Sequence, residues 1–299
     1  MTHTGGTLGD IIVGIDGSED SAQALRWAAA EAHRRGGRLK ILTGYTSTWP
    51  PEAFGYPGPS LDYTREPFET IVAEAIGQAR AFAPGLDVTG AAVLGDPASE
   101  LIEASRSAAM VVVGNRGRGG FASLLLGSVS QQVATHAAVP VVVVRGRADS
   151  ACGPIVVGVD ASPSAQQVIE LAFEQAQQRG SALTAVRTYT LPIPPRGADT
   201  PPLLYDQHAV REAAAGELHA ALAPWQEKYP DVAVHALIGL GSPAQYLVER
   251  SHGATLLVVG SRGHGALAGT LLGSVGQQLL HHAACPVMIV RSPVGAARV

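Results

Sequence analysis

Two glycine-rich segments with the same spacing are the residues of this chain best suited to bind an anion. Each follows the pattern G-x2-G-x9-G-S, first from Gly114 to Ser128 and again from Gly260 to Ser274. Glycine lets backbone N–H groups come close to phosphate oxygens, and the final Gly-Ser opens a predicted helix whose first N–H groups can bind an anion. The spacing therefore predicts a phosphate-binding site in each half of the chain.

An aspartate follows the first predicted strand of each half. Asp16 ends the apolar run that begins at Ile11, and Asp160 ends the matching run from Ile155. In parallel α/β sheets, ligands bind beyond the carboxyl ends of the strands, where the strand order reverses. If the first and fourth strands are neighbours, the aspartate and the glycine loop face each other. The alternative is that the aspartates only favour the dipole of the next helix.

The chain is an internal repeat. The segment Ile11–Ser18 is matched 144 residues later by Ile155–Ser162, and Val111–Arg145 aligns without a gap with Leu257–Arg291, at 21 identical positions in 35. The boundary between the halves is expected in Gly146–Gly153, a short polar stretch.

Each half is predicted to alternate five strands with four helices. This order is typical of the doubly wound α/β fold, in which a parallel sheet has helices on both faces. The sequence therefore predicts two tandem domains, 8–146 and 154–292, each a five-stranded parallel sheet flanked by helices. The strands are expected at Ile11–Ile15, Leu39–Gly44, Val88–Leu94, Met110–Val113 and Val141–Val144, and at Ile155–Val159, Leu183–Thr188, Val232–Ile238, Leu256–Val259 and Val287–Val290.

The helix ends are also marked in the sequence. Ser18 and Ser162 are the expected N-caps of the first helices, with Pro163 at the first helical position of the second copy. Gly36 and Gly180 are expected to end these helices. Later helices are predicted at Phe68–Phe82, Ser128–Ala138, Val210–Tyr229 and Ser274–Ala284, with two more beginning at Pro97 and Pro243.

Composition limits the class of protein. The length of 299 residues suits two domains, and 46% apolar with 15% charged residues indicates compact cores. A net charge of −4 disfavours nucleic acid, and the sequence contains no apolar run of the ~20 residues that span a bilayer. Cys152 and Cys285 form no metal-spaced pair. We therefore expect a cytoplasmic protein with neither a membrane nor a nucleic-acid partner.

The doubled G-x2-G-x9-G-S pattern, preceded in each half by a strand ending Val-Gly-hydrophobic-Asp, resembles the ATP-binding branch of the universal stress proteins. The resemblance covers nearly the whole chain as two tandem domains. It implies the strand order 3-2-1-4-5, pairing of domains through strand five, and no dedicated catalytic base. It also implies that Asp16 and Asp160 lie against the nucleoside, while the glycine loops and the Gly-Ser-Val segments hold ribose and phosphates.

The candidate ATP-binding residues combine these aspartates with both glycine motifs. Arg116 and Arg262 are expected either to touch phosphate or only to face solvent. Alanine at Gly117 or Gly263 is expected to occupy the space of the phosphates. The candidates are Gly14, Asp16, Gly114, Arg116, Gly117, Arg118, Gly119, Gly127, Ser128 and Val129, and in the second half Gly158, Asp160, Gly260, Arg262, Gly263, His264, Gly265, Gly273, Ser274 and Val275.

Other nucleotide and catalytic motifs are disfavoured. Gly117-x-Gly119-x-x-Ala122 mimics a dinucleotide fingerprint but has no acidic residue about 20 positions later. The only two lysines, Lys40 and Lys228, are far from any glycine loop, which excludes a Walker A motif. Neither G-x-S-x-G nor H-E-x-x-H occurs.

The sequence thus predicts a tandem ATP-binding regulator of the stress response that binds ATP in both halves. Its nucleotide occupancy would bias its conformation or its association with an unidentified protein partner. Self-association is expected through the internal domain pair, with a homodimer as a candidate assembly. One alternative is a slow ATPase or nucleotidyl-transfer enzyme that uses the same pockets with Mg²⁺ bridging the phosphates, and another is a structural dimer with vestigial pockets.

Overall fold

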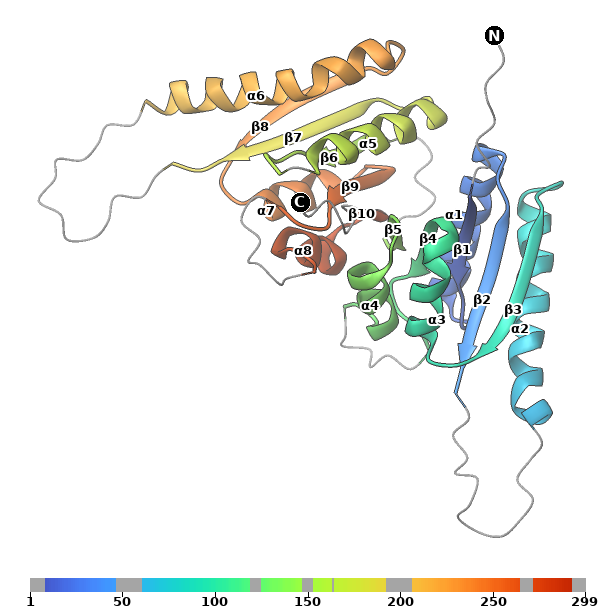
Figure 1. Ribbon diagram of the computed structural model, residues 1–299. Coiled ribbons are helices and arrows are strands. Elements are labelled where there is room, and N and C mark those ends of the chain that lie inside the picture. The colour runs from blue at the N-terminus through green and yellow to red at the C-terminus, as the bar shows by residue number, and fades with distance from the viewer. Residues whose placement is uncertain are drawn as a thin grey trace, which may run out of the picture. The chain divides into compact units, whose positions relative to one another are not determined.

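The computed structural model describes residues 9–46, 61–118, 125–146, 153–162, 164–191, 206–263 and 271–291. The chain divides into two compact units (Figure 1). Unit 1 comprises Met1–Ala148 with Pro286–Val299, and unit 2 comprises Asp149–Cys285. Both are layered α/β units built on a mostly parallel sheet, so the predicted fold class is confirmed.

Unit 1 contains a six-stranded sheet in the order β3-β2-β1-β4-β5-β10. Strands β1 to β5 are parallel, and β10 joins β5 antiparallel, with Met288 opposite Val142. The expected strand order 3-2-1-4-5 is thus confirmed for unit 1. The expected pairing between the fifth strands of the two repeats is confirmed by the β5–β10 pair. The elements are β1 (Asp10–Gly14), α1 (Glu19–Arg35), β2 (Leu39–Tyr45), α2 (Leu61–Phe82), β3 (Val88–Leu94), α3 (Pro97–Ala104), the short 3₁₀ turn Ser105–Ser107, β4 (Ala108–Gly114), α4 (Ser128–His136), β5 (Val141–Val144) and β10 (Val287–Val290).

Unit 2 repeats this plan with four parallel strands in the order β9-β6-β7-β8. By sequence β10 is the fifth strand of this repeat, but it lies in unit 1. The elements are β6 (Ile155–Gly158), α5 (Ala165–Arg179), β7 (Leu183–Tyr189), α6 (Gln207–Lys228), β8 (Val234–Leu240), α7 (Pro243–Ser251), β9 (Leu256–Gly260) and α8 (Ser274–His282).

Apolar side chains on both faces of the central strands hold the layers together. Ile11, Ile12 and Val13 of β1 are all buried, because α1 and α2 pack together on one face of the sheet and α3 and α4 on the other (Figure 1). In unit 2, α5 directs a buried stripe that includes Ile169 and Phe173 onto its sheet. This packing fixes the carboxyl ends of the strands, where the candidate residues lie.

Both first helices end as predicted, but only the first of them begins as predicted. Gly36 and Gly180 are left-handed C-caps, with φ of 63° and 60°. Ser18 caps α1, since its side chain accepts from the backbone N–H of Ser21. The predicted N-cap Ser162 is wrong: α5 begins at Ala165, and the Ser162 hydroxyl donates to Asp160 instead. Pro163 lies outside the described residues.

Several predicted boundaries are corrected by the structure. Helix α2 begins at Leu61 rather than Phe68, and α4 and α8 end two residues early, at His136 and His282. Strand β8 is shifted two residues from the predicted Val232–Ile238, because the N–H of Val232 closes a turn onto the Tyr229 carbonyl before the strand starts.

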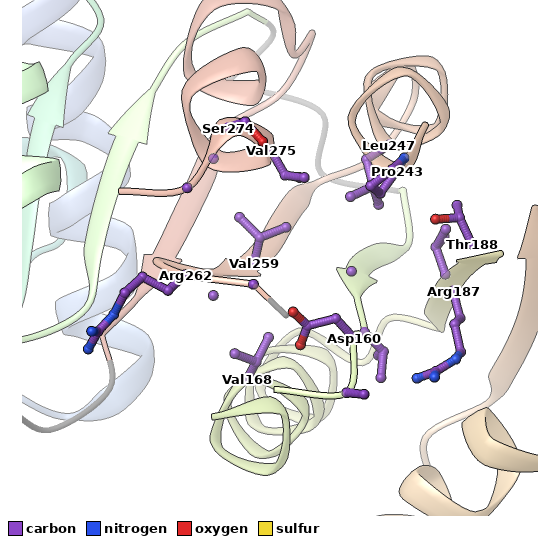
Figure 2. Close-up of a pocket in the computed structure, with 18 of the residues that line it drawn as sticks. Asp160, Val168, Arg187, Thr188, Pro243, Leu247, Val259, Arg262, Ser274 and Val275 are labelled. Atoms are coloured by element: carbon purple, nitrogen blue, oxygen red, sulfur yellow. The ribbon is translucent and has the colours of Figure 1, made fainter. Parts of the chain in front are cut away.

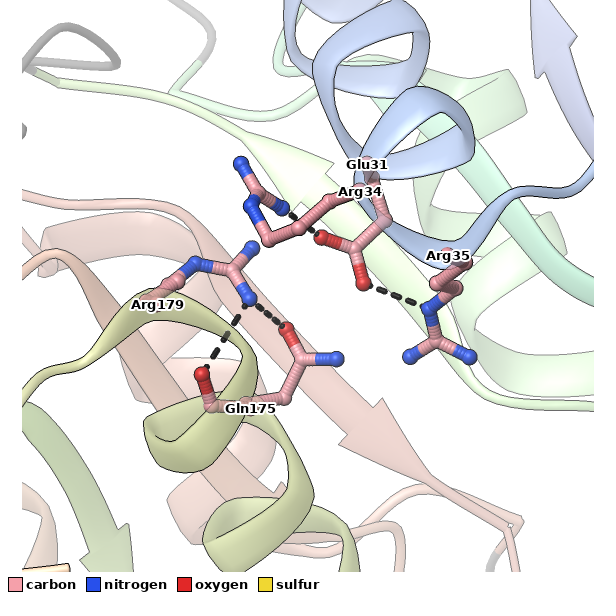
Figure 3. A network of polar contacts seen from close by, with 5 residues as sticks. All are labelled: Glu31, Arg34, Arg35, Gln175 and Arg179. Atoms are coloured by element: carbon pink, nitrogen blue, oxygen red, sulfur yellow. Dashed lines mark hydrogen bonds and ion pairs between the residues drawn. The ribbon is translucent and has the colours of Figure 1, made fainter. Parts of the chain in front are cut away.

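Local polar contacts stabilise the last turns of the first helices (Figure 3). In α1, Glu31 accepts from Arg34 and, at 2.6 Å, from Nε of Arg35. In α5, Arg179 donates to the side-chain oxygen of Gln175 at 2.5 Å. Cations near a helix C-terminus also interact favourably with the helix dipole. Within the described segments, no helix is long and apolar enough to cross a membrane.

Candidate functional site

A cavity of about 700 Å³ lies in unit 2 beyond the carboxyl ends of β6, β7 and β9 (Figure 2). Strands β6 and β9 are the first and fourth strands of the repeat and are neighbours in the sheet. The cavity is therefore at the point where the strand order reverses, which is the usual ligand site of such sheets. Its volume lies within the ~300–1,000 Å³ typical of small-molecule sites.

One end of the cavity is formed by the start of α8. Gly273 is the N-cap, and its position offers no side-chain hydrogen bond to the helix start. The first residues of the helix, Ser274, Val275 and Gly276, line the cavity. The first N–H groups of a helix lack intrahelical partners and attract anions. Arg262, from the loop after β9, is among the residues that line the cavity, and its guanidinium points away from Asp160 (Figure 2). This end is suited to phosphate.

Asp160 lies in the middle of the cavity wall (Figure 2). Its Oδ1 accepts from the backbone N–H of Ser162 at 3.1 Å and from the Ser162 hydroxyl at 2.6 Å. A Cβ atom built on Gly263 would lie 3.0 Å from Asp160 Oδ2. The aspartate and the glycine loop therefore meet, as the sequence predicted for neighbouring first and fourth strands.

The equivalent aspartate of unit 1 has the same relation to its loop. Asp16 Oδ1 accepts from the N–H of Ser18 at 3.0 Å, and Oδ2 accepts from the N–H of Arg118 at 2.7 Å. Burial raises the pKa of Asp16, but the hydrogen bonds from Ser18 and Arg118 outweigh it and hold the pKa below its ordinary value. Asp16 therefore remains ionised at neutral pH and ties the loop after β4 to the end of β1.

Gly117 is required by this contact. Its φ is not positive, so backbone strain does not explain the glycine. A Cβ at this position would lie 2.5 Å from Asp16 Oδ2, closer than real Cβ atoms come to their neighbours. The described structure thus has an obstacle to alanine in the aspartate of the same site, and the clash with phosphates stays a prediction.

The remaining candidate glycines allow close packing around the sites. A Cβ on Gly114 would lie 2.6 Å from the carbonyl oxygen of Asp20, and one on Gly14 would lie 2.7 Å from Leu101. Gly158 and Gly260 line the cavity of unit 2. Gly127 is the N-cap of α4, which begins with Ser128 and Val129 as expected. Gly119, His264 and Gly265 lie outside the described residues.

The motif search missed the wall formed by β7 and α7. Val186, Arg187 and Thr188 of β7 line the cavity, and Pro243 and Leu247 of α7 lie beside Thr188 (Figure 2). The strand order could have pointed to these residues. In the order 3-2-1-4 the second strand ends at the same edge of the sheet as the first and fourth strands.

Comparison with known proteins agrees with this architecture. The model of the universal stress protein family matches residues 8–145 and 152–291. A universal stress protein of Mycobacterium tuberculosis is 37% identical over 292 residues, which cover 94% of this chain and 96% of that protein. One of Mycolicibacterium smegmatis is 35% identical over 294 residues, with the same coverage.

A solved structure has the same fold. The crystal structure of a universal stress protein from Archaeoglobus fulgidus matches with a TM-score of 0.71 at 22% identity, covering 94% of this chain and 98% of that one. Two family matches that span almost the whole sequence, together with relatives similar over their whole length, show that this chain belongs to the universal stress protein family as a tandem of two such domains.

Proposed function

We propose that the chain binds ATP in the cavity of unit 2 and at the equivalent place in unit 1, and that nucleotide occupancy regulates its association with another protein in the stress response. The observation that carries the proposal is the cavity itself. It joins an uncapped helix start, an arginine and an aspartate with an apolar wall, all at the switch point of a parallel sheet.

The lining of the cavity suits the parts of a nucleoside triphosphate. The phosphates would meet the N–H groups at Gly273–Val275 and the Arg262 guanidinium. The nucleoside would lie against Asp160, whose carboxylate can accept from ribose hydroxyls. The apolar side chains of Val168 and Leu247 would contact the base.

The same lining favours binding over turnover. Asp160 is the only carboxylate among the described residues that form the cavity, and it already accepts two hydrogen bonds from Ser162. Mg²⁺ would therefore be held mainly by the phosphates and water, as is usual for this ion. We propose the cytoplasm as the location of the protein, and we expect it to self-associate. An unidentified protein would bind one nucleotide state in preference to the other.

The direct test is the nucleotide content of the purified protein. Heat denaturation should release ATP at up to two molecules per chain. Calorimetric titration of nucleotide-free protein should show ATP binding, and ATP at a hundredfold excess over its Kd should raise stability by about 2.7 kcal/mol. A titration without binding would end the proposal, and sustained hydrolysis above that of a pocket mutant would favour the enzyme alternative.

A further inference from the structure

The end of the unit 2 cavity at β7 carries a cationic side chain. Arg187 lines the cavity, and only 14% of its side chain is exposed. Its Nη2 donates to Glu217 of α6, whose side chain is 61% exposed. Figure 2 shows the Arg187 side chain extending along the wall from the end of β7, beside Thr188. The cavity therefore has a cationic side chain at the wall formed by β7.

Arg187 has hydrogen-bonding capacity beyond its contact with Glu217. A guanidinium offers five N–H donors and no acceptor, and one carboxylate can accept at most two of them in the bidentate arrangement. Among the residues that the structure describes, Glu217 is the only one to which Arg187 donates a hydrogen bond. The other donors are available to a ligand in the cavity.

The position of Arg187 selects the part of the ligand that it meets. With phosphates at the start of α8, the base lies toward β7 and the apolar Leu247. Because Glu217 already balances the charge of Arg187, a neutral acceptor suits it better than a second phosphate, which would be repelled by the carboxylate. Guanine presents two adjacent acceptors, O6 and N7, to an arginine, whereas adenine places an amino donor beside N7.

Unit 1 has no such group at the equivalent position. Leu39 pairs with Ile11 in unit 1 as Leu183 pairs with Ile155 in unit 2, so the fifth residue of each second strand, Thr43 or Arg187, occupies the same place. Thr43 is 2% exposed and carries no charge. Its short side chain cannot supply the forked pair of donors that Arg187 offers.

We propose that Arg187 reads position 6 of a purine, so that the unit 2 site takes 6-oxopurine nucleotides more readily, relative to ATP, than the unit 1 site does. This inference rests on the nucleotide function proposed above. It assigns Arg187 as a specificity-determining residue and Glu217 as the residue that positions it.

The test is calorimetric titration of the full chain with ATP, GTP and ITP. Inosine shares O6 with guanine but lacks its 2-amino group, so ITP isolates the contact at position 6. R187M should lower the affinity of one site for GTP and ITP by about tenfold more than its affinity for ATP. E217Q keeps both the arginine and a side-chain oxygen that can accept its hydrogen bond, so it should retain the preference. R211M, at an exposed position of α6 outside the cavity, is the matched control and should leave the ratio unchanged.

The outcomes separate this inference from the nucleotide function. If R187M lowered ATP, GTP and ITP affinity equally, Arg187 would not select the base, and the nucleotide site would stand. If R187M instead weakened the binding of adenosine 3′,5′-bisphosphate more than that of its isomer ADP, Arg187 would bind a phosphate. That result would overturn the base contact. If none of the nucleotides bound the wild-type chain, both proposals would fail. R187K, which keeps the charge without the fork, should also lose the preference and replaces R187M if that variant melts early.

Discussion

The two repeats have an arginine at the same position of the motif, but its charged neighbours differ. In unit 1, Nε of Arg116 lies 3.4 Å from Oδ2 of Asp20, in the first turn of α1. In unit 2 the equivalent residues are Arg262 and Ser164, and within the described parts of the chain Arg262 has no ion pair. Arg116 is thus partly neutralised, whereas Arg262 is not paired among the described residues. Identical motif residues therefore do not imply equal affinity, because the field at the site includes residues outside the motif.

A second difference lies in the turn after the first strand. Gly17 has a φ of 79°, and a Cβ on it would lie 2.9 Å from Cζ of Arg118, so the guanidinium covers this glycine. Unit 2 has Ala161 at the same place, with no positive φ. The turn of unit 1 is therefore built to receive an arginine side chain, and the turn of unit 2 is not.

The largest expected effect comes from alanine in the glycine loops. G117A places a methyl group 2.5 Å from Asp16 Oδ2, whereas G263A places one 3.0 Å from Asp160 Oδ2. Overpacking of this kind costs about 1–3 kcal/mol. We expect G117A to weaken ATP binding in unit 1 by at least about tenfold, and G263A to weaken unit 2 by a few fold.

Adenosine distinguishes the cause of this loss in the same titrations. If Asp16 faces the nucleoside as proposed, the methyl group displaces it, and adenosine binding should fall together with ATP binding in G117A. Loss of ATP with full retention of adenosine would instead locate the clash at the phosphates. Equal losses in G117A and G263A would remove the expected difference between the units.

The predictability of this site depended on the range of the interactions. The buried runs at Ile11 and Met110 and the aspartate that follows β1 are local patterns and could be recognised in the sequence, whereas the order that makes the first and fourth strands neighbours was implied only by the family resemblance. The Arg116–Asp20 pair could not, since it joins residues 96 positions apart through a loop whose path the sequence does not specify. Arg187 was missed because only the strand order brings the end of β7 to the cavity.

The predicted N-cap of the second repeat was wrong although its residue type is suitable. Ser162 has the residue type of an N-cap, but α5 begins only at Ala165, and the Ser162 hydroxyl donates to the Asp160 carboxylate. Ser18 also has an aspartate, Asp16, two residues before it, yet its side-chain oxygen accepts from the N–H of Ser21. An N-cap propensity scale gives both serines the same score and therefore cannot predict that Ser18 caps its helix while Ser162 does not.

The next effect in size should come from Gly17. G17A forces an alanine into a left-handed conformation and against Arg118, which should destabilise the chain by about 1–2 kcal/mol in thermal or urea unfolding. The reciprocal A161G should cost less, about 0.5–1 kcal/mol, because it only adds flexibility to the unfolded chain. Equal losses would show that the two turns are equivalent in spite of their geometry.

Asp16 gives a pH-dependent test of the tie between β1 and the loop of unit 1. Because its folded-state pKa lies below the ordinary value near 3.9, ionised Asp16 contributes stability above that pH, and the contribution is lost as pH falls through the lower folded pKa. D16N weakens the charge-assisted bonds from Ser18 and Arg118 and should lower stability by about 1 kcal/mol at pH 7. Urea unfolding from pH 7 to pH 2 should show this gap closing in acid, and a gap independent of pH would assign the loss to packing.

The smallest effect tests the charge difference directly, by exchanging the neighbours of the two arginines. D20S gives unit 1 the residue of unit 2, and S164D does the reverse. The Arg116–Asp20 pair is partly exposed, with side chains 45% and 26% accessible, so its strength should be below about 1 kcal/mol and the change in ATP affinity below about fivefold. Titrations at low and high salt should show D20S raising affinity in unit 1 and S164D lowering it in unit 2, with both changes shrinking as salt increases. Changes of this sign that persisted at high salt would indicate an altered helix start, since the first turns of α1 and α5 differ in their caps, and the comparison would then concern shape and not charge.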